Sequence, residues 1–112
     1  MSPTEPPMIL TVFRSRLRPD AEARGYHAVA DDMEREARAM PGFREFKTFT
    51  AEDGERISIA AFDGIESHDR WRDHPDHRAA QRRGREEFYA EYRISVAEVL
   101  REHSFTAGPD HR

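Results

Sequence analysis

The amino-acid sequence predicts an α+β domain in which strands and helices follow one another in the order β-α-β-β-α-β. Apolar residues alternate at residues 8–17, 43–51, 56–62 and 92–100, and they recur at helical spacing in the two longer segments between them. Pro-Gly and Asp-Gly pairs separate several of these segments. This order gives the ferredoxin-like arrangement, a four-stranded antiparallel sheet with helices on one side.

The N-terminal half is predicted to hold one strand and one long helix. Residues 8–17 have the period of two that is typical of a strand, and Pro19 interrupts this pattern. Asp20 is a suitable N-cap for a helix. The apolar residues that follow recur at helical spacing as far as Met40, where a Pro-Gly pair ends the helix.

The second half begins with a predicted hairpin. Residues 43–51 and 56–62 form its two strands, and the Asp-Gly pair between them favours a tight turn. Ser67 is expected to cap a short helix, and Pro75 suits the first turn of another helix that runs to about residue 89. The last strand is expected at residues 92–100 and can extend to residue 105.

Apolar side chains are expected on both faces of the predicted sheet. Strict alternation sets Ile59 against Phe62 on the third strand, and Phe43 and Phe49 against Phe46 on the second. Helices on one side can cover only one of these faces. Each large apolar side chain left in water forgoes roughly 1.5–3 kcal/mol. We therefore predict a homodimer in which two sheets pack face to face about a two-fold axis.

Length and composition indicate one globular domain. The chain has 112 residues, of which 37% are hydrophobic and 36% charged. A net charge of −4 argues against a nucleic-acid partner, and no apolar run is long enough to span a membrane. Without cysteine there is no thiol chemistry, and we expect a cytoplasmic protein. The domain is expected at residues 8–106, between a disordered lead-in (1–7) and a flexible tail (107–112).

Two motifs resemble a known family. MPGF stands at residues 40–43, and the pattern W…HPxH…AQ…GR…FY stretches from Trp71 to Tyr89. With the predicted element order they resemble the antibiotic biosynthesis monooxygenase superfamily of dimeric α/β-barrel proteins, over residues 8–106. The resemblance implies a sheet-to-sheet dimer with a pocket between helices and sheet in each subunit. Members include cofactor-free, quinone-forming oxygenases, haem-degrading oxygenases, small-quinol oxygenases and proteins without a known reaction.

The motif residues of the two best-defined branches are only partly present. For quinone-forming members the resemblance implies an Asn on the third strand, then a Trp and a Tyr around the following helix, and the matching positions here hold Ala61, Ile65 and Trp71. Haem-degrading members have an Asn, a Trp and an axial His, where this chain has Ser15, Trp71 and Gln81. The resemblance therefore carries over an aromatic residue at Trp71 and neither complete set.

One face of the helix after Pro75 is predicted to be a pocket wall, or else to pack plainly on the sheet. It carries His77, Gln81 and Phe88 together with two small residues. The predicted catalytic residues are His77 as a general base, Trp71 as an aromatic wall and Gln81 as a hydrogen-bond donor. The residues expected to contact substrate are Arg14, Tyr26, His74, Arg85, Phe88 and Tyr89.

Three histidines near this helix leave two alternatives open. His68, His74 and His77 can hold a haem iron or another metal if their rings converge. Otherwise each makes local hydrogen bonds and no metal site is expected. The arginines among them alternate with acidic residues, which is typical of a solvated helix face.

The predicted function is that of a small monooxygenase, an oxidoreductase acting on an electron-rich phenol, quinol or polyketide-type aromatic with O₂. In a cofactor-free mechanism the substrate's own carbanion reduces O₂, and the protein supplies a base and an oxyanion donor. One alternative is a haem-binding or haem-degrading protein that uses a helix histidine. Another is a non-catalytic dimer that binds a small ligand, because one fold hosts many functions.

Overall fold

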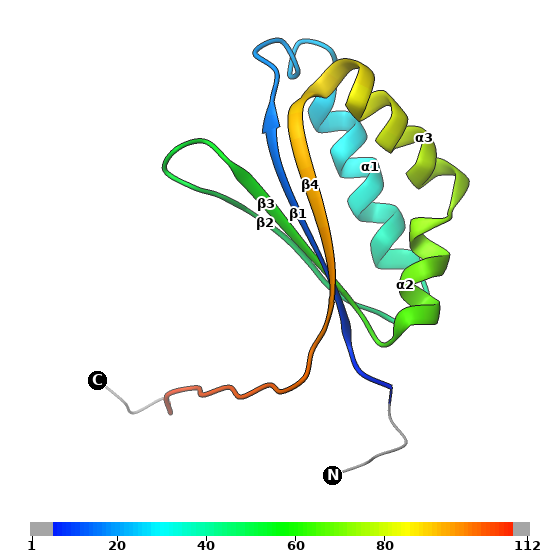
Figure 1. Ribbon diagram of the computed structural model, residues 1–112, viewed down its shortest axis with the longest axis vertical. Coiled ribbons are helices and arrows are strands. Elements are labelled where there is room, and N and C mark those ends of the chain that lie inside the picture. Colours follow the sequence, from blue (N-terminus) through cyan, green and yellow to red (C-terminus); the bar gives the residue numbers. More distant parts are fainter. Residues whose placement is uncertain (1–5, 109–112) are drawn as a thin grey trace.

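The computed structural model describes residues 6–108, in which one antiparallel sheet carries helices on a single side (Figure 1). The strands are β1 (Ile9–Leu17), β2 (Phe43–Thr50), β3 (Arg56–Phe62) and β4 (Tyr89–Glu98), in the spatial order β2-β3-β1-β4. The helices are α1 (Tyr26–Ala39), α2 (Ile65–Arg72) and α3 (Pro75–Arg83), followed by a π-helical turn (Gly84–Phe88). The predicted fold class is thus confirmed.

The start of α1 differs from the prediction, because Asp20 does not cap this helix. Residues 20–25 form turns, and Gly25 adopts the left-handed conformation with φ 97° just before Tyr26. The carboxylate of Asp20 instead accepts a 2.7 Å hydrogen bond from Nε of Arg24. A left-handed glycine redirects the chain, so the regular helix starts only beyond it.

The end of the helical region also differs from the prediction. α3 stops at Arg83, the π-helical turn follows, and β4 begins three residues earlier than the expected residue 92. Arg18 donates three hydrogen bonds, of 2.7–2.9 Å, to the backbone carbonyls of Arg85, Glu86 and Tyr89. These bonds satisfy carbonyl groups that a helix end leaves without partners. β4 ends at Glu98, so the expected extension to residue 105 is absent.

Ser67 lies inside α2 rather than at its start, where the prediction had placed it. Gly64 is the N-cap residue, and the hydroxyl of Ser67 donates to the carbonyl of Gly64 at 3.1 Å. Gly42 packs closely against this helix: a Cβ at Gly42 would lie 2.5 Å from Oγ of Ser67. The Pro-Gly pair therefore ends α1 and also allows α2 to approach the start of β2.

The core between sheet and helices forms two clusters. One is built around Phe62 and Trp71 with two buried alanines, and the other around Tyr26 and Phe88. Phe43 and Phe46 both pack against the first cluster, although strict alternation predicted opposite faces. The β2–β3 register shifts between Phe43 and Glu45, as in a β-bulge. The extra residue in β2 brings the side chains of Phe43 and Phe46 to the same face of the sheet.

Two apolar surfaces lie outside the helix layer. The sheet register places Leu10, Val12 and Ile59 on the face away from the helices, where they are only partly buried. The segment after β4 leaves the body of the domain (Figure 1), and its Leu100 and Phe105 are 88% and 80% exposed. Consistent with this projecting segment, the radius of gyration is 16.2 Å, against about 13 Å for a compact chain of similar length.

The described helices include none with the length and apolar character needed to cross a membrane. The predicted lead-in and tail fall mainly on residues 1–5 and 109–112, which lie outside the described residues.

Candidate functional site

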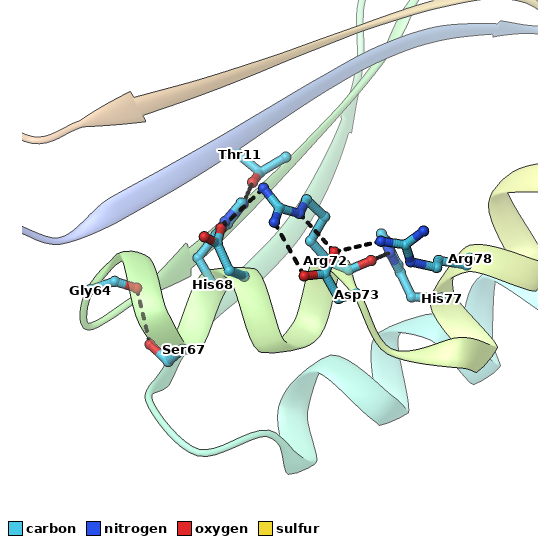
Figure 2. A network of polar contacts seen from close by, with 9 residues as sticks. Thr11, Gly64, Ser67, His68, Arg72, Asp73, His77 and Arg78 are labelled. Atoms are coloured by element: carbon cyan, nitrogen blue, oxygen red, sulfur yellow. Dashed lines mark hydrogen bonds and ion pairs between the residues drawn. The ribbon is translucent and has the colours of Figure 1, made fainter.

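A buried histidine joins the helix layer to the sheet. His68 of α2 is 2% exposed, and its Nε2 lies 2.6 Å from Oγ1 of Thr11 on β1 (Figure 2). Its Nδ1 lies 3.0 Å from a carboxylate oxygen of Asp69. Because a carboxylate accepts, Nδ1 carries the proton, and in the neutral ring Nε2 then accepts from the Thr11 hydroxyl. The chain of contacts Thr11–His68–Asp69 therefore has a defined direction.

Trp71 stands next to this histidine in a stack of rings. Its indole ring lies 5.2 Å from the ring of Phe62, centroid to centroid, with 28° between the planes. The ring of His77 lies 4.3 Å away, and His68 contacts the indole at 6.3 Å. Trp71 is only 6% exposed, yet its Nε1–H has no hydrogen-bond partner among the described residues. A buried donor without an acceptor is uncommon in proteins.

His77 is held in one tautomer. Its Nδ1 lies 3.2 Å from the backbone carbonyl of Arg72, which can only accept, so Nδ1 is the protonated nitrogen. Burial lowers the pKa of His77 below its usual 6.5, although the Arg72 hydrogen bond opposes this shift. The ring is therefore neutral at pH 7, with a lone pair on Nε2, and Nε2 has no hydrogen-bond partner within residues 6–108. This is the form that a general base requires.

Charged side chains flank this histidine on the solvent side. Asp73 accepts hydrogen bonds from Arg72 and from Arg78, at 2.9–3.2 Å, as Figure 2 shows. These two arginines lower the pKa of Asp73 to about 2. The exposed carboxylate stays ionised at any physiological pH, and its arginines hold the α2–α3 connection around His77.

The third predicted catalytic residue, Gln81, lies one helical turn beyond His77 on α3. It is half-buried on α3 and makes no side-chain hydrogen bond within the described part of the chain. The other residues of the predicted pocket wall pack elsewhere: Ala80 lines a groove between α1 and α3, and Phe88 is buried in the second core cluster. The π-helical turn explains the position of Phe88, because it changes the angular spacing beyond Arg83.

Several residues expected to contact substrate are engaged elsewhere. Arg14 lies on the sheet face away from the helices, where Nε and Nη2 form a two-pronged ion pair with Glu55 at 2.9 and 3.0 Å. Tyr26 and Phe88 are core residues whose rings meet edge to face at 5.6 Å. Arg85 is exposed and donates to the hydroxyl of Tyr92. None of these four is brought to the Trp71–His77 stack.

Tyr89 lies in a cluster of aromatic rings at the start of β4. It meets Phe13, Tyr26 and Tyr92 at centroid distances of 5.2–6.1 Å. Burial, with Tyr26 beside it, raises the pKa of the Tyr89 hydroxyl well above 10, so this phenol remains protonated. Gly84 permits the packing, since a Cβ there would lie 2.5 Å from the Tyr89 ring.

The three histidines do not converge on one metal site. His68 has both ring nitrogens engaged, His77 stacks on Trp71, and His74 caps α3 by accepting from the backbone N–H of Asp76 at 3.1 Å. Among the described residues, the group whose ligand atoms lie within 4.8 Å of one another is Glu36, His74 and Asp76. Of these three residues, the sequence predicted only His74 as a metal ligand, because Glu36 lies far away in the chain on α1.

The sheet leaves an uncovered apolar strip on the helix side of β4. Val96 pairs with Thr11 and Ile94 pairs with Phe13, so both point to the side that carries the helices. They remain 51% and 39% exposed because β4 is an edge strand. The strip therefore borders the Thr11–His68 contact. Two grooves are lined mainly by residues of the helix layer, and neither of these two is lined by Trp71 or His77.

Comparison with known proteins agrees with this architecture. The model of the antibiotic biosynthesis monooxygenase family matches residues 8–83, more than half of the chain. This chain belongs to the antibiotic biosynthesis monooxygenase family. Its relative YqjZ, an uncharacterized protein of Bacillus subtilis, is 32% identical over 101 residues, which cover 90% of this chain and 87% of YqjZ.

Two solved structures show the same fold as this family member. Rv0793 from Mycobacterium tuberculosis has a TM-score of 0.75 at 23% identity and covers 87% of this chain and 99% of its own. SnoaB from Streptomyces nogalater, a cofactor-independent oxygenase, has a TM-score of 0.67 at 14% identity, with 93% and 99% covered. At these identities the likeness concerns the fold.

The sequence reasoning missed two members of the site, Thr11 and Asp69. A signal for Thr11 was present, because it is the polar residue between Ile9 and Phe13 on the inner face of the first strand. A buried hydroxyl requires a hydrogen-bond partner, so that position predicts a polar group on the covering helix. Asp69 gave no such signal among the many acidic residues of this segment.

Proposed function

We propose that this family member is a homodimeric, cofactor-independent monooxygenase that oxidises a small electron-rich phenol, quinol or polyketide-type aromatic with O₂. The observation that carries the proposal is the pairing of His77 with Trp71: a neutral imidazole with a free Nε2 lone pair stacks on a buried indole with a free N–H. Family membership and a cofactor-independent oxygenase of the same fold support the class of reaction.

The chemistry needs one base and one donor. Nε2 of His77 removes a proton from an activated ring carbon, and the resulting carbanion reduces O₂ to a peroxide bound at that carbon. Cleavage of the O–O bond, with loss of the second hydrogen of the carbon, leaves a carbonyl and releases one molecule of water. The Nε1–H of Trp71 donates to the oxygen that becomes negative when the first proton leaves.

The proposed binding surface is the uncovered strip of β4. Ile94 and Val96 provide apolar area for a planar ring, and Val96 lies opposite Thr11, which contacts His68 beside Trp71. Gln81 and the Tyr89 hydroxyl remain proposed polar contacts of the substrate. No function is assigned to either side chain yet, so substitution of each one tests whether it contacts the substrate.

The proposed dimer covers the sheet face away from the helices. Leu10, Val12 and Ile59 lie there on the two central strands. The projecting segment after β4 adds Leu100 and Phe105, which nothing within the described residues of one chain covers. A second copy packed on this face would bury both surfaces and would close the edge beside β4.

The experiment is an oxygen-uptake assay with small quinols and activated phenols, with product analysis for the new carbonyl. His77→Gln is expected to lower kcat by about 10²- to 10⁴-fold, the usual contribution of a general base. Trp71→Phe retains a stacking ring and removes the donor, so it should lower kcat with little change in KM. Equal rates in the parent protein and in His77→Gln would refute this assignment.

Two alternative functions give distinct readouts. A haem protein would show a Soret band with haem that is lost in His74→Ala or His77→Ala, whereas His68 has both ring nitrogens engaged. A non-catalytic dimer that binds aromatic ligands would show a higher melting temperature with the ligand and no oxygen uptake.

A further inference from the structure

Two carboxylates and a histidine meet on the outer surface, where α1 passes the start of α3. Glu36 projects from α1, His74 is the N-cap residue of α3, and Asp76 lies in the first turn of α3. One ligand atom of each lies within 4.8 Å of the others, and Nδ1 of His74 lies 3.3 Å from Oε1 of Glu36. Glu36 and Asp76 line one groove and His74 lines its neighbour, so the cluster is open to solvent.

The nearby arginines do not neutralise this cluster. Arg35 pairs with Asp32, Arg78 pairs with Asp73, and Arg83 pairs with Glu87. Within residues 6–108, Glu36 has no ion pair except with His74, and Asp76 has none. About half of the described carboxylates pair with an arginine, whereas these two stand together without one.

The hydrogen bonding of His74 sharpens this point. Its Nδ1 accepts from the backbone N–H of Asp76, so Nδ1 carries no proton and its single lone pair is engaged in capping α3. The oxygen of Glu36 that faces Nδ1 is also an acceptor when ionised, and two acceptors 3.3 Å apart repel each other. A positive centre between the three groups would turn that repulsion into attraction.

We propose that Glu36, His74 and Asp76 bind a divalent transition cation, with Zn²⁺ as the best-fitting ion, which clamps α1 to the start of α3. One imidazole nitrogen and two carboxylate oxygens form a ligand set that suits zinc, with water completing the tetrahedron. Zinc bound at Nδ1 would take the lone pair that now accepts from the N–H of Asp76, so the ion would replace the capping hydrogen bond. Asp76 is exposed and free to rotate toward the ion.

The clamp acts on the segment that holds His77. His74 and His77 are separated by one helical turn of α3, and His77 is anchored through the Arg72 carbonyl at the end of α2. Fixing the start of α3 on α1 therefore stiffens the connection between α2 and α3. The proposal is independent of any reaction, because its first effect is on binding and stability.

The test is calorimetric titration of tag-free protein with Zn²⁺, together with melting curves in Zn²⁺ and in EDTA. One saturable zinc site per chain and a melting temperature that rises with zinc and returns with EDTA are expected. Glu36→Gln and Asp76→Asn should each weaken zinc binding by at least about tenfold. His74→Asn keeps an N-capping oxygen and removes the imidazole. It should therefore also weaken zinc binding, while its melting temperature in EDTA should equal that of the parent protein.

The matched control is His27→Gln. His27 is an exposed histidine 2.7 Å from Glu22, with no second carboxylate in the contact. Zinc binding that survives Glu36→Gln and His74→Asn, or that disappears in His27→Gln, overturns the proposal. An equal rise of the melting temperature with Mg²⁺ also overturns it, because charge neutralisation alone would then suffice without the imidazole.

Discussion

Nε2 of His68 on α2 and Oγ1 of Thr11 on β1 lie 2.6 Å apart, and both side chains are buried. This contact joins two elements that are far apart in sequence, and it is the polar link between the short helix and the sheet. Asp69 holds the other ring nitrogen at 3.0 Å, so each nitrogen of the imidazole has a partner. Such a pair both orients Trp71, one turn further along α2, and stabilises the fold.

Thr11→Val should therefore destabilise the protein far more than its small change in shape suggests. The substitution keeps the volume and removes the hydroxyl, which leaves Nε2 of His68 buried without a partner. The free energy of unfolding is expected to fall by about 1–3 kcal/mol, measured by urea denaturation. Thr48→Val is the control, because Thr48 makes an exposed 2.8 Å hydrogen bond to Ser58 on the same sheet. Its change should stay within about 0.5 kcal/mol, and equal losses at both positions would count against the buried contact.

The strands were predictable and the contacts between elements were not. Period-two patterns located β1 and β3 almost to the residue, since strand patterns depend on local alternation. The start of α1 was missed because one left-handed residue, Gly25, keeps the residues before it out of the helix despite their helical periodicity. Phe43 and Phe46 lie on the same face of the sheet because of a bulge, and this bulge has no local signature in the sequence.

The candidate site was predictable only where one segment carries it. Trp71 and His77 lie close in sequence, and their stacking follows from two short consecutive helices. Thr11 and Glu36 reach the same region from the other half of the chain, so their roles depend on tertiary packing that sequence spacing does not specify. Arg14 was misjudged for a related reason: its strand face could be counted, but which face the helices cover could not.

Stability should depend on pH through His77. The unfolded chain takes up a proton on this ring near pH 6.5, whereas burial holds the folded pKa lower. Between these two values the unfolded state binds more protons, so the free energy of unfolding falls as pH falls through 6.5 toward the folded pKa. Urea midpoints between about pH 7.5 and about pH 5.5 should show this decline, and His77→Gln should reduce it. A decline of the same size in His77→Gln would assign it to other groups.

Turnover should follow the same ionisation. Only the neutral ring can accept a proton, so kcat is expected to rise with pH through the lowered pKa of His77 and to be level above about pH 7.5. The measurement is kcat for oxygen uptake across this range with a saturating quinol. A Trp71→Phe variant should keep the shape of the profile at a lower plateau, since the indole does not titrate. A profile that rises only above pH 8 would point to ionisation of the substrate instead.

The sign of the stability change in Gly84→Ala distinguishes an effect of close packing from an effect of helix propensity. Gly84 has φ −56°, ordinary helical backbone, so propensity alone predicts that alanine stabilises by up to about 1 kcal/mol. The structure predicts the reverse, because the new Cβ would lie 2.5 Å from Cε2 of Tyr89. Overpacking of this kind costs about 1–3 kcal/mol, and the melting temperature should drop accordingly. In a Tyr89→Ala background the penalty should vanish, and a stabilising Gly84→Ala in the parent protein would contradict the packing.

The sheet face opposite the helices should decide the oligomeric state. Val12 lies on the central strand β1 between Ile59 and Ser95, on the face that the helices leave bare. Val12→Glu would place a charge in the centre of the proposed dimer contact, where desolvation without a partner is unfavourable. Ile65→Glu is the matched control, since Ile65 is 51% exposed on α2 in the helix layer. Sedimentation at micromolar concentration should show a dimer for the parent and for Ile65→Glu, and a folded monomer by circular dichroism for Val12→Glu. A parent protein that sediments as a monomer would remove the dimer and leave the apolar face of β1 and β3 without an explanation.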